Sequence, residues 1–192
     1  MKLITIVLLA LVIAAGVNAE TTGLGMGAFS SESGAILMTV DASLVNRTVD
    51  SPYVMFVVYM AAKDGGRSIS VAAKDVVMVY NGREYAMPTV KELRASYAGG
   101  IRDLEFYRRL GKEGVNASWV RMYQFPETAN FFPPLALGQE LAVDTGHMVG
   151  NRGFLTPLYF KNPGLAKGER LTIKIRDQRD PGLSGECEVV LD

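Results

Sequence analysis

The chain has 192 residues, with 20 basic and 20 acidic side chains, one cysteine and one histidine. A chain of this length buries about 70% of its unfolded surface, so it needs neither a disulfide nor a metal to fold. The balanced charge argues against a nucleic-acid-binding protein. The single Cys and His exclude zinc fingers, iron–sulfur clusters and an intrachain disulfide, and no phosphate loop or dinucleotide motif predicts a cofactor.

Residues 1–19 have the pattern of a signal peptide. Lys2 gives a positive start, residues 3–15 are apolar, and Val17 and Ala19 suit the −3 and −1 positions of a cleavage site before Glu20. A transmembrane helix needs about 20 apolar residues, which makes an uncleaved anchor the less favoured alternative. We therefore expect a secreted or periplasmic protein that has no transmembrane span after cleavage.

The mature chain begins with a segment rich in Gly, Ser and Thr, residues 20–34. This composition predicts a flexible N-terminal arm in front of a single β-sandwich domain at 35–192. Glycines alternate with apolar residues from Gly23 to Ala28, so an extended arm would carry a small apolar face suited to pairing with a sheet edge. The flexible spacer is the favoured interpretation, because glycine in a strand loses more entropy than other residues.

Two strands are predicted next. Between 36 and 44 apolar residues fall mainly on one face, which indicates a half-buried strand. Residues 53–62 (YVMFVVYMAA) are apolar on both faces and rich in β-branched and aromatic types. This pattern predicts a central strand that is covered on both sides.

A short strand at 69–73 precedes a predicted β-hairpin. Asn81-Gly82 separates the β runs 76–80 and 83–87, and this dipeptide favours a type I′ turn because both residues then need positive φ. From Thr89 to Glu92 the spacing is that of a capping box. It begins a helical insertion at about 89–110, which would provide cover for the central strand.

Later β runs lie at 119–125, 139–143, 154–160, 170–176 and 186–191. In the last two, alternation places basic residues opposite Glu186 and Glu188 across an antiparallel ladder, which we favour over an anion-binding role. Cys187 alternates with apolar residues, which predicts a buried small hydrophobe rather than a nucleophile. Trp119 opens its run and is expected to lie partly buried in the core.

Nine or ten short strands with turns between them predict a mainly β, antiparallel sandwich. Two stretches, VVMVYNGREYAMP at 76–88 and the segment 137–177, carry a further pattern. The second contains Leu-Gly-Gln-Glu, then GFLTPLYF, then LTIKIRD. Together they resemble the telokin-like immunoglobulin-type domains of exported bacterial proteins of unassigned function. The resemblance implies an immunoglobulin-like sandwich with a binding or accessory role and no catalytic residues; the helical insertion and residues 144–151 depart from it.

One triplet is a candidate for catalysis. Asp144-Thr145-Gly146 follows an apolar run, as in the active-site loop of aspartic proteases. That chemistry needs two carboxylates sharing a proton, so a homodimer would have to supply the second; a simple Asp-Gly turn is the favoured interpretation. Asp144 and His147 lie three positions apart on a loop, which does not establish the buried orienting contact of a triad, so His147 is interpreted as a partly exposed loop residue. One His lacks partners for a metal site.

The segment 125–134 contains three prolines and is therefore predicted to be a surface loop. Phe131 and Phe132 point in opposite directions in an extended chain, so at least one is expected to be exposed. With Phe125 they are the candidate binding residues, as rigid aromatic anchors for a partner. The alternative is that the loop folds back and caps one end of the sandwich.

These observations favour an exported, non-catalytic β-sandwich protein that binds another protein or a component of the cell envelope. A second hypothesis is a structural subunit whose arm, residues 20–34, adds a strand to a neighbour and so forms an oligomer. A third is a homodimeric aspartic-type hydrolase built around Asp144.

Overall fold

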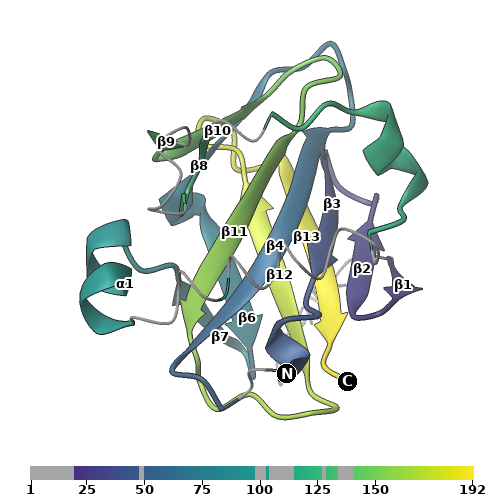
Figure 1. Ribbon diagram of the computed structural model, residues 1–192. Coiled ribbons are helices and arrows are strands. Elements are labelled where there is room, and N and C mark those ends of the chain that lie inside the picture. Colours follow the sequence, from purple (N-terminus) through teal and green to yellow (C-terminus); the bar gives the residue numbers. More distant parts are fainter. Residues whose placement is uncertain (1–19, 48–49, 98–102, 104–114, 127–128, 134–140) are drawn as a thin grey trace, which may run out of the picture.

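The computed structural model describes residues 20–47, 50–97, 103, 115–126, 129–133 and 141–192. The described chain is mainly β-structure, and most of its strand residues lie in two larger antiparallel sheets (Figure 1). The first sheet has the order β1-β2-β3-β4-β11, with β1 (Thr21–Gly25), β2 (Ala28–Ser31), β3 (Ile36–Asp41), β4 (Tyr53–Ala62) and β11 (Phe154–Lys161). The second has the order β13-β12-β6-β7, with β13 (Ser184–Val190), β12 (Arg170–Arg176), β6 (Val76–Tyr80) and β7 (Arg83–Ala86). The mainly β, antiparallel prediction is confirmed.

The smaller elements lie around these sheets. β5 (Ile69–Ala72) pairs with β10 (Thr145–Met148), and β8 (Ala129–Asn130) pairs in parallel with β9 (Leu141–Ala142). The described residues also form the short 3₁₀ helices η1 (Val45–Arg47), η2 (Ala73–Asp75) and η4 (Ser118–Met122), and α1 spans Val90–Ser96. Among the residues that the structure describes, no helix combines the length and the apolar composition of a membrane span.

The core lies between the two larger sheets. β13 packs against the face of β3, where Gly185 leaves room for the neighbouring backbone: a Cβ atom there would lie 2.5 Å from the carbonyl oxygen of Ile36. Ile173, Val189 and Cys187 of the second sheet are fully buried, as are Met38, Val40 and Phe56 of the first. The prediction of a buried Cys187 is confirmed.

The centre of the first sheet is buried on both faces. Strand β4 has the predicted bounds and the predicted cover on both sides. β3 was expected to be half-buried, but all six of its residues are buried. The difference arises on the more polar face of β3. There Thr39 Oγ1 is hydrogen-bonded to Ser30 Oγ of β2 at 3.2 Å, and Trp119 of η4 covers this pair.

Aromatic side chains from loops cover the outer face of β4 and β11. Tyr97, at the end of α1, lies with its ring centroid 5.4 Å from that of Tyr53 and 6.5 Å from that of Tyr159. The predicted capping box at Thr89 and Glu92 is confirmed, with both hydrogen bonds formed. Helix α1 thus covers part of the central sheet as expected; the rest of the predicted insertion, except residue 103, lies outside the described residues.

Local turn and ladder predictions are also confirmed. Asn81 and Gly82 have φ of 49° and 73°, as a type I′ turn requires. Between β12 and β13, Arg170 bonds Glu188 at 2.6 Å and Lys174 bonds Glu186 at 3.0 Å. Each such exposed cross-strand pair contributes about 0.2–1 kcal/mol.

The segment expected to be a flexible arm is instead a β-hairpin. β1 pairs with β2, and β2 pairs with β3, so residues 21–31 extend the first sheet. The glycines here form the turn of the hairpin and do not act as a flexible spacer. Gly25, Met26 and Gly27 have φ of 85°, 54° and 79°, a left-handed backbone that Gly adopts without strain. The hairpin is held because Ala28 and Ser30 are buried and partly buried Phe29 packs against the core.

The run 119–125 was expected to be a strand, but its first part forms the 3₁₀ helix η4. An alternating pattern of so few residues fits either structure, and the local contacts decide between them. Trp119 is buried at the start of the helix, with ring centroids 5.7 Å from Tyr123 and 6.1 Å from Phe125. The expectation that Trp119 is part of the core is confirmed.

Candidate functional site

The hairpin β1–β2 forms one side of a groove with a volume of about 500 Å³. The other side is the short segment 116–118 that leads into η4. We call this the hairpin groove, and its lining residues are Glu20, Thr22, Leu24, Ser30, Glu32, Ser33, Asn116, Ala117 and Ser118. It lies at the β1 end of the five-stranded sheet, on the right of Figure 1.

Trp119 fixes the second wall of the groove. Its indole Nε1 donates a hydrogen bond to Ser30 Oγ at 3.0 Å, which links η4 to β2 across 89 positions of sequence. The buried ring packs against Tyr123 and Phe125, and Phe125 in turn contacts Tyr59 of β4 with a centroid distance of 5.2 Å. The segment 116–118 is therefore held over the hairpin by a packed aromatic group.

Most of the residues that line the groove are polar, and two of them are acidic. Glu20 and Glu32 are exposed and lie just beyond the last recorded pair of the hairpin, Thr21 with Ser31. Both glutamates line the groove, so two acidic side chains share this end of the hairpin. Hydroxyl groups of Thr22, Ser30, Ser33 and Ser118 supply donors and acceptors along the same surface.

Two basic side chains lie next to this lining without pairing with its carboxylates. Lys63 Nζ donates to the backbone carbonyl of Glu32 at 2.6 Å, and Arg121 bonds the side-chain oxygen of Asn116. The described part of the chain shows no ion pair to either Glu20 or Glu32. The lining of the groove therefore holds two like charges.

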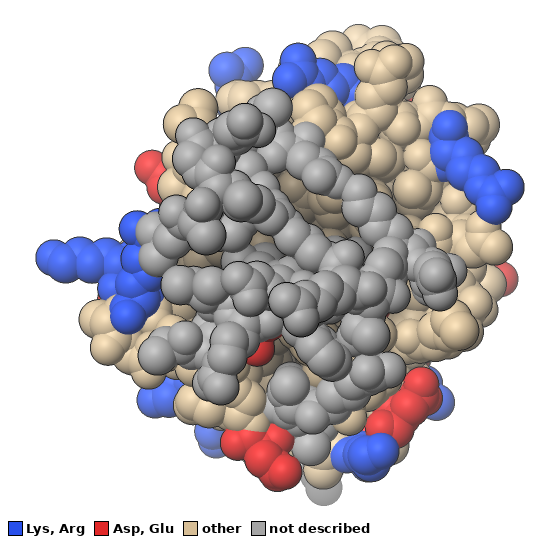
Figure 2. All heavy atoms as spheres, viewed as in Figure 1, with Lys and Arg blue, Asp and Glu red and all other residues tan. Residues whose placement is uncertain are grey.

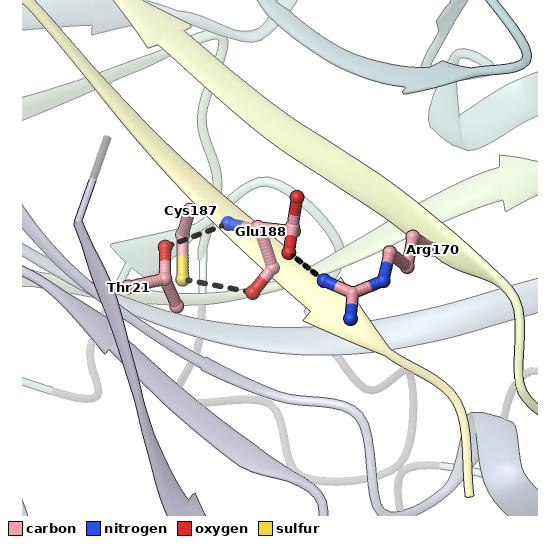
Figure 3. Close-up of polar contacts among 4 residues, drawn as sticks. All are labelled: Thr21, Arg170, Cys187 and Glu188. Atoms are coloured by element: carbon pink, nitrogen blue, oxygen red, sulfur yellow. Dashed lines mark hydrogen bonds and ion pairs between the residues drawn. The ribbon is translucent and has the colours of Figure 1, made fainter. Parts of the chain in front are cut away.

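The hairpin is also tied to the second sheet (Figure 3). Thr21 of β1 accepts a hydrogen bond through Oγ1 from the backbone N–H of Glu188, at 3.0 Å, while the Glu188 carboxylate binds Arg170. Cys187 beside it is buried, and burial raises the pKa of its thiol to about 12. A thiol held protonated in this way is a poor nucleophile at neutral pH.

The predicted aromatic binding residues do not form an exposed surface. Phe131 and Phe132 are buried, and Phe125 is partly buried. Phe131 packs on Phe154 at 5.2 Å and Phe132 on Tyr159 at 5.3 Å. The loop folds back on the sheet, which is the alternative considered from the sequence: Thr156 Oγ1 accepts a hydrogen bond from the Phe131 N–H at 2.9 Å, and the two rings pack on opposite faces of β11.

The catalytic candidates are not assembled into an active site. Asp144 is exposed, and its backbone carbonyl accepts a hydrogen bond from the Ala73 N–H at 2.8 Å. His147 lies on β10 opposite Ser70 of β5, and its Nδ1 is 3.0 Å from Ser70 Oγ. A Ser–His pair supplies two members of a hydrolytic triad. Its capacity for catalysis depends on a third, acidic side chain that orients the histidine.

Asp177 is the carboxylate next to this pair, and it is bound to backbone instead of to His147. Its Oδ2 accepts the Ser70 N–H at 2.7 Å, and its Oδ1 accepts the N–H groups of Arg179 and Asp180, each at 2.8 Å. The carboxylate therefore organises the loop after β12. Searching only the described ranges, we find no group of three His, Cys, Asp or Glu side chains that could hold a metal ion.

Comparisons with protein-family models, with curated proteins and with solved structures found no match. The alternating glycines of 20–34 predicted one side of the groove as a possible pairing segment. The second wall comes from a segment about 90 positions away. No sequence pattern joins the two.

Proposed function

We propose that the chain is an exported, immunoglobulin-like β-sandwich protein without catalytic activity, which binds another protein or a component of the cell envelope in the hairpin groove. The groove carries the proposal, because it is a hollow of about 500 Å³ with a fixed wall and a polar lining. The signal-peptide pattern of residues 1–19 and the resemblance to exported telokin-like domains support export and the immunoglobulin-like fold.

The chemistry of the described side chains favours binding over catalysis. Asp144 is exposed, while an aspartic hydrolase needs a carboxylate pair shielded enough to share one proton. Asp177, the carboxylate beside the Ser70–His147 pair, accepts hydrogen bonds from three backbone N–H groups. Charged groups on the face in Figure 2 are separate and of both signs, without a continuous basic patch over the atoms described there.

Site-specific photo-cross-linking in the native host tests this function. A photoreactive residue in place of exposed Ser118 is expected to yield a discrete cross-linked product, because Ser118 faces the groove. The same residue in place of Lys74, which is exposed on η2 and does not line the groove, serves as the matched control. Equal labelling from both positions, or no product from Ser118, would contradict a binding function for the groove.

Export makes a separate prediction about the N-terminus. The extracytoplasmic protein is expected to begin at Glu20, which intact-mass measurement of the purified chain can establish. Ala19→Arg should block cleavage, since the −1 position accepts only small side chains, and the precursor should then accumulate. An extracytoplasmic chain that retains residues 1–19 would show that the leader is not a cleaved signal peptide.

A further inference from the structure

Three segments that are distant in the sequence meet at the upper end of Figure 1. Residues 63–67 follow β4, residues 121–124 include the end of η4, and residues 149–152 lie in the connection between β10 and β11. Tyr123 joins the first two segments, because its hydroxyl donates a hydrogen bond to the carbonyl of Ala62 at 2.8 Å. We call these three segments together the turn surface.

Backbone contacts hold the segments of the turn surface together. The Gln124 N–H donates to the Asn151 carbonyl at 2.8 Å, and the Gly153 N–H donates to the Gln124 carbonyl at 2.9 Å. Gly65 lies against Gly150, since a Cβ atom on Gly65 would be 3.7 Å from the Gly150 carbonyl oxygen. The turn surface is therefore continuous across three separate parts of the chain.

Two large apolar side chains are exposed on the turn surface. Met122 is 68% exposed and Val149 is 51% exposed, and they are two of the four large hydrophobic residues that lie exposed in the described part of the chain. Each lies two positions before a residue of the Gln124–Asn151 hydrogen bond. A single exposed apolar side chain is ordinary in a folded protein, whereas two that share one surface are a candidate contact site.

The turn surface is also positively charged. Its exposed charged residues are one acid, Asp64, and four bases, Lys63, Arg67, Arg121 and Arg152. Arg67 lies 3.8 Å from Asp64. Lys63 donates to a backbone carbonyl and Arg121 to a neutral amide oxygen, so neither of these hydrogen bonds neutralises the charge. Figure 2 shows Lys and Arg side chains along the same upper edge, with uncharged atoms between them.

We propose that the turn surface binds the surface of an anionic lipid bilayer. Met122 and Val149 enter the interfacial region, and the four basic side chains contact the phosphates of the headgroups. Binding of this kind depends on the buried apolar area together with the attraction between cations and anionic lipids. None of these six residues lines the hairpin groove, so the membrane contact is independent of what the groove binds.

An acidic protein is the other occupant with the matching charge. Such a partner would have to enclose Met122 and Val149 in a pocket of complementary shape in order to remove them from water. The interface of a bilayer receives exposed apolar side chains without a matching shape, and its anionic headgroups supply the opposite charge beside them. The combination of exposed apolar and basic side chains on one surface therefore favours a membrane.

Co-sedimentation with lipid vesicles tests the contribution of charge. The purified exported chain should bind vesicles of phosphatidylcholine that contain about one-third phosphatidylglycerol, and should bind pure phosphatidylcholine at least about tenfold more weakly. Arg121→Gln and Arg152→Gln should each weaken binding to the anionic vesicles about fivefold. Arg83→Gln, at an exposed residue of β7 outside the turn surface, is the control and should leave binding unchanged.

Serine substitutions test the apolar contribution separately. Met122→Ser and Val149→Ser should each weaken binding about threefold or more, since each removes apolar area from the membrane interface. Met26→Ser is the matched control, because Met26 is 75% exposed in the turn between β1 and β2. All three positions are exposed, so the melting temperature should not change. Weaker binding of the arginine variants alone, with both serine variants equal to the parent, would contradict insertion.

A fluorescent dye identifies the surface that touches the bilayer. Cys187 is buried, so an environment-sensitive dye labels only the new thiol of Val149→Cys or, as the control, of Met26→Cys. Emission from the dye at position 149 should shift to the blue with the anionic vesicles, and emission from the dye at position 26 should not.

Failure to bind the anionic vesicles, equal binding to both kinds of vesicle, or a blue shift at position 26 alone would overturn the proposal. Binding of labelled poly-glutamate without binding to vesicles would assign the turn surface to an acidic protein instead.

Discussion

Trp119→Ala is expected to lower the free energy of unfolding by about 3–5 kcal/mol, the usual effect of truncating a buried aromatic residue. The substitution leaves a cavity between η4 and the sheet, and it removes the hydrogen bond from Nε1 to Ser30. For a domain of this size, such a loss lowers the melting temperature by on the order of 10 °C. Thermal unfolding followed by circular dichroism measures the change.

The same helix offers a matched control. Met122 belongs to η4 but is 68% exposed, so Met122→Ala should leave the melting temperature within about a degree. Trp119→Phe keeps most of the ring packing and should fall between the two. A loss of less than about 1 kcal/mol for Trp119→Ala would show that the ring does not anchor the wall of the groove.

Asp177→Asn is expected to lower the free energy of unfolding by about 2–3 kcal/mol at neutral pH, because its buried carboxylate accepts three backbone N–H groups. Burial by itself raises the pKa of Asp177. The N–H groups of Ser70, Asp180 and Arg179 and the Arg179 charge lower it further than burial raises it, so the pKa lies below its ordinary value. Asp144→Asn, at an exposed carboxylate, is the control and should have little effect.

The lowered pKa fixes the direction of the pH dependence. A group with a lower pKa in the folded state stabilises the protein above its unfolded pKa of about 3.9, and this contribution is lost as the pH falls through the folded value. The difference between the parent protein and Asp177→Asn should therefore be full at pH 7 and should shrink below about pH 4. Urea unfolding at pH 7, 5 and 3 measures it, and a difference that does not change with pH would contradict the assignment.

The features that the sequence predicts correctly depend on neighbours in the chain or on simple alternation. Asn81-Gly82 selects its turn through backbone preference, and Thr89 with Glu92 closes a capping box within one helical turn. The β12–β13 ladder follows from two alternating runs of opposite charge. In each case the interacting residues themselves form the sequence pattern.

The features that the sequence does not predict depend on contacts between distant segments. The glycine-rich sequence of residues 20–34 predicts mobility, because no interaction within the segment orders it. The order comes from pairing with β3 and from the Thr21–Glu188 hydrogen bond. Phe131 and Phe132 are buried because they pack on Phe154 and Tyr159 of β11, and local sequence does not specify these contacts. The groove needs both the hairpin and the wall held by Trp119, so neither segment alone predicts a site.

The bond between Thr21 and Glu188 joins residues 167 positions apart, and this separation has a consequence for folding kinetics. The hairpin β1–β2 pairs with β3, which follows it closely in the sequence, whereas its link to β13 must wait until the last strand has been synthesised. Long-range pairing of this kind slows folding, because the loop-closure entropy is lost before the contact is gained. We therefore expect the link to β13 to close late, and in a nascent chain that still lacks β13 the hairpin is held through its pairing with β3.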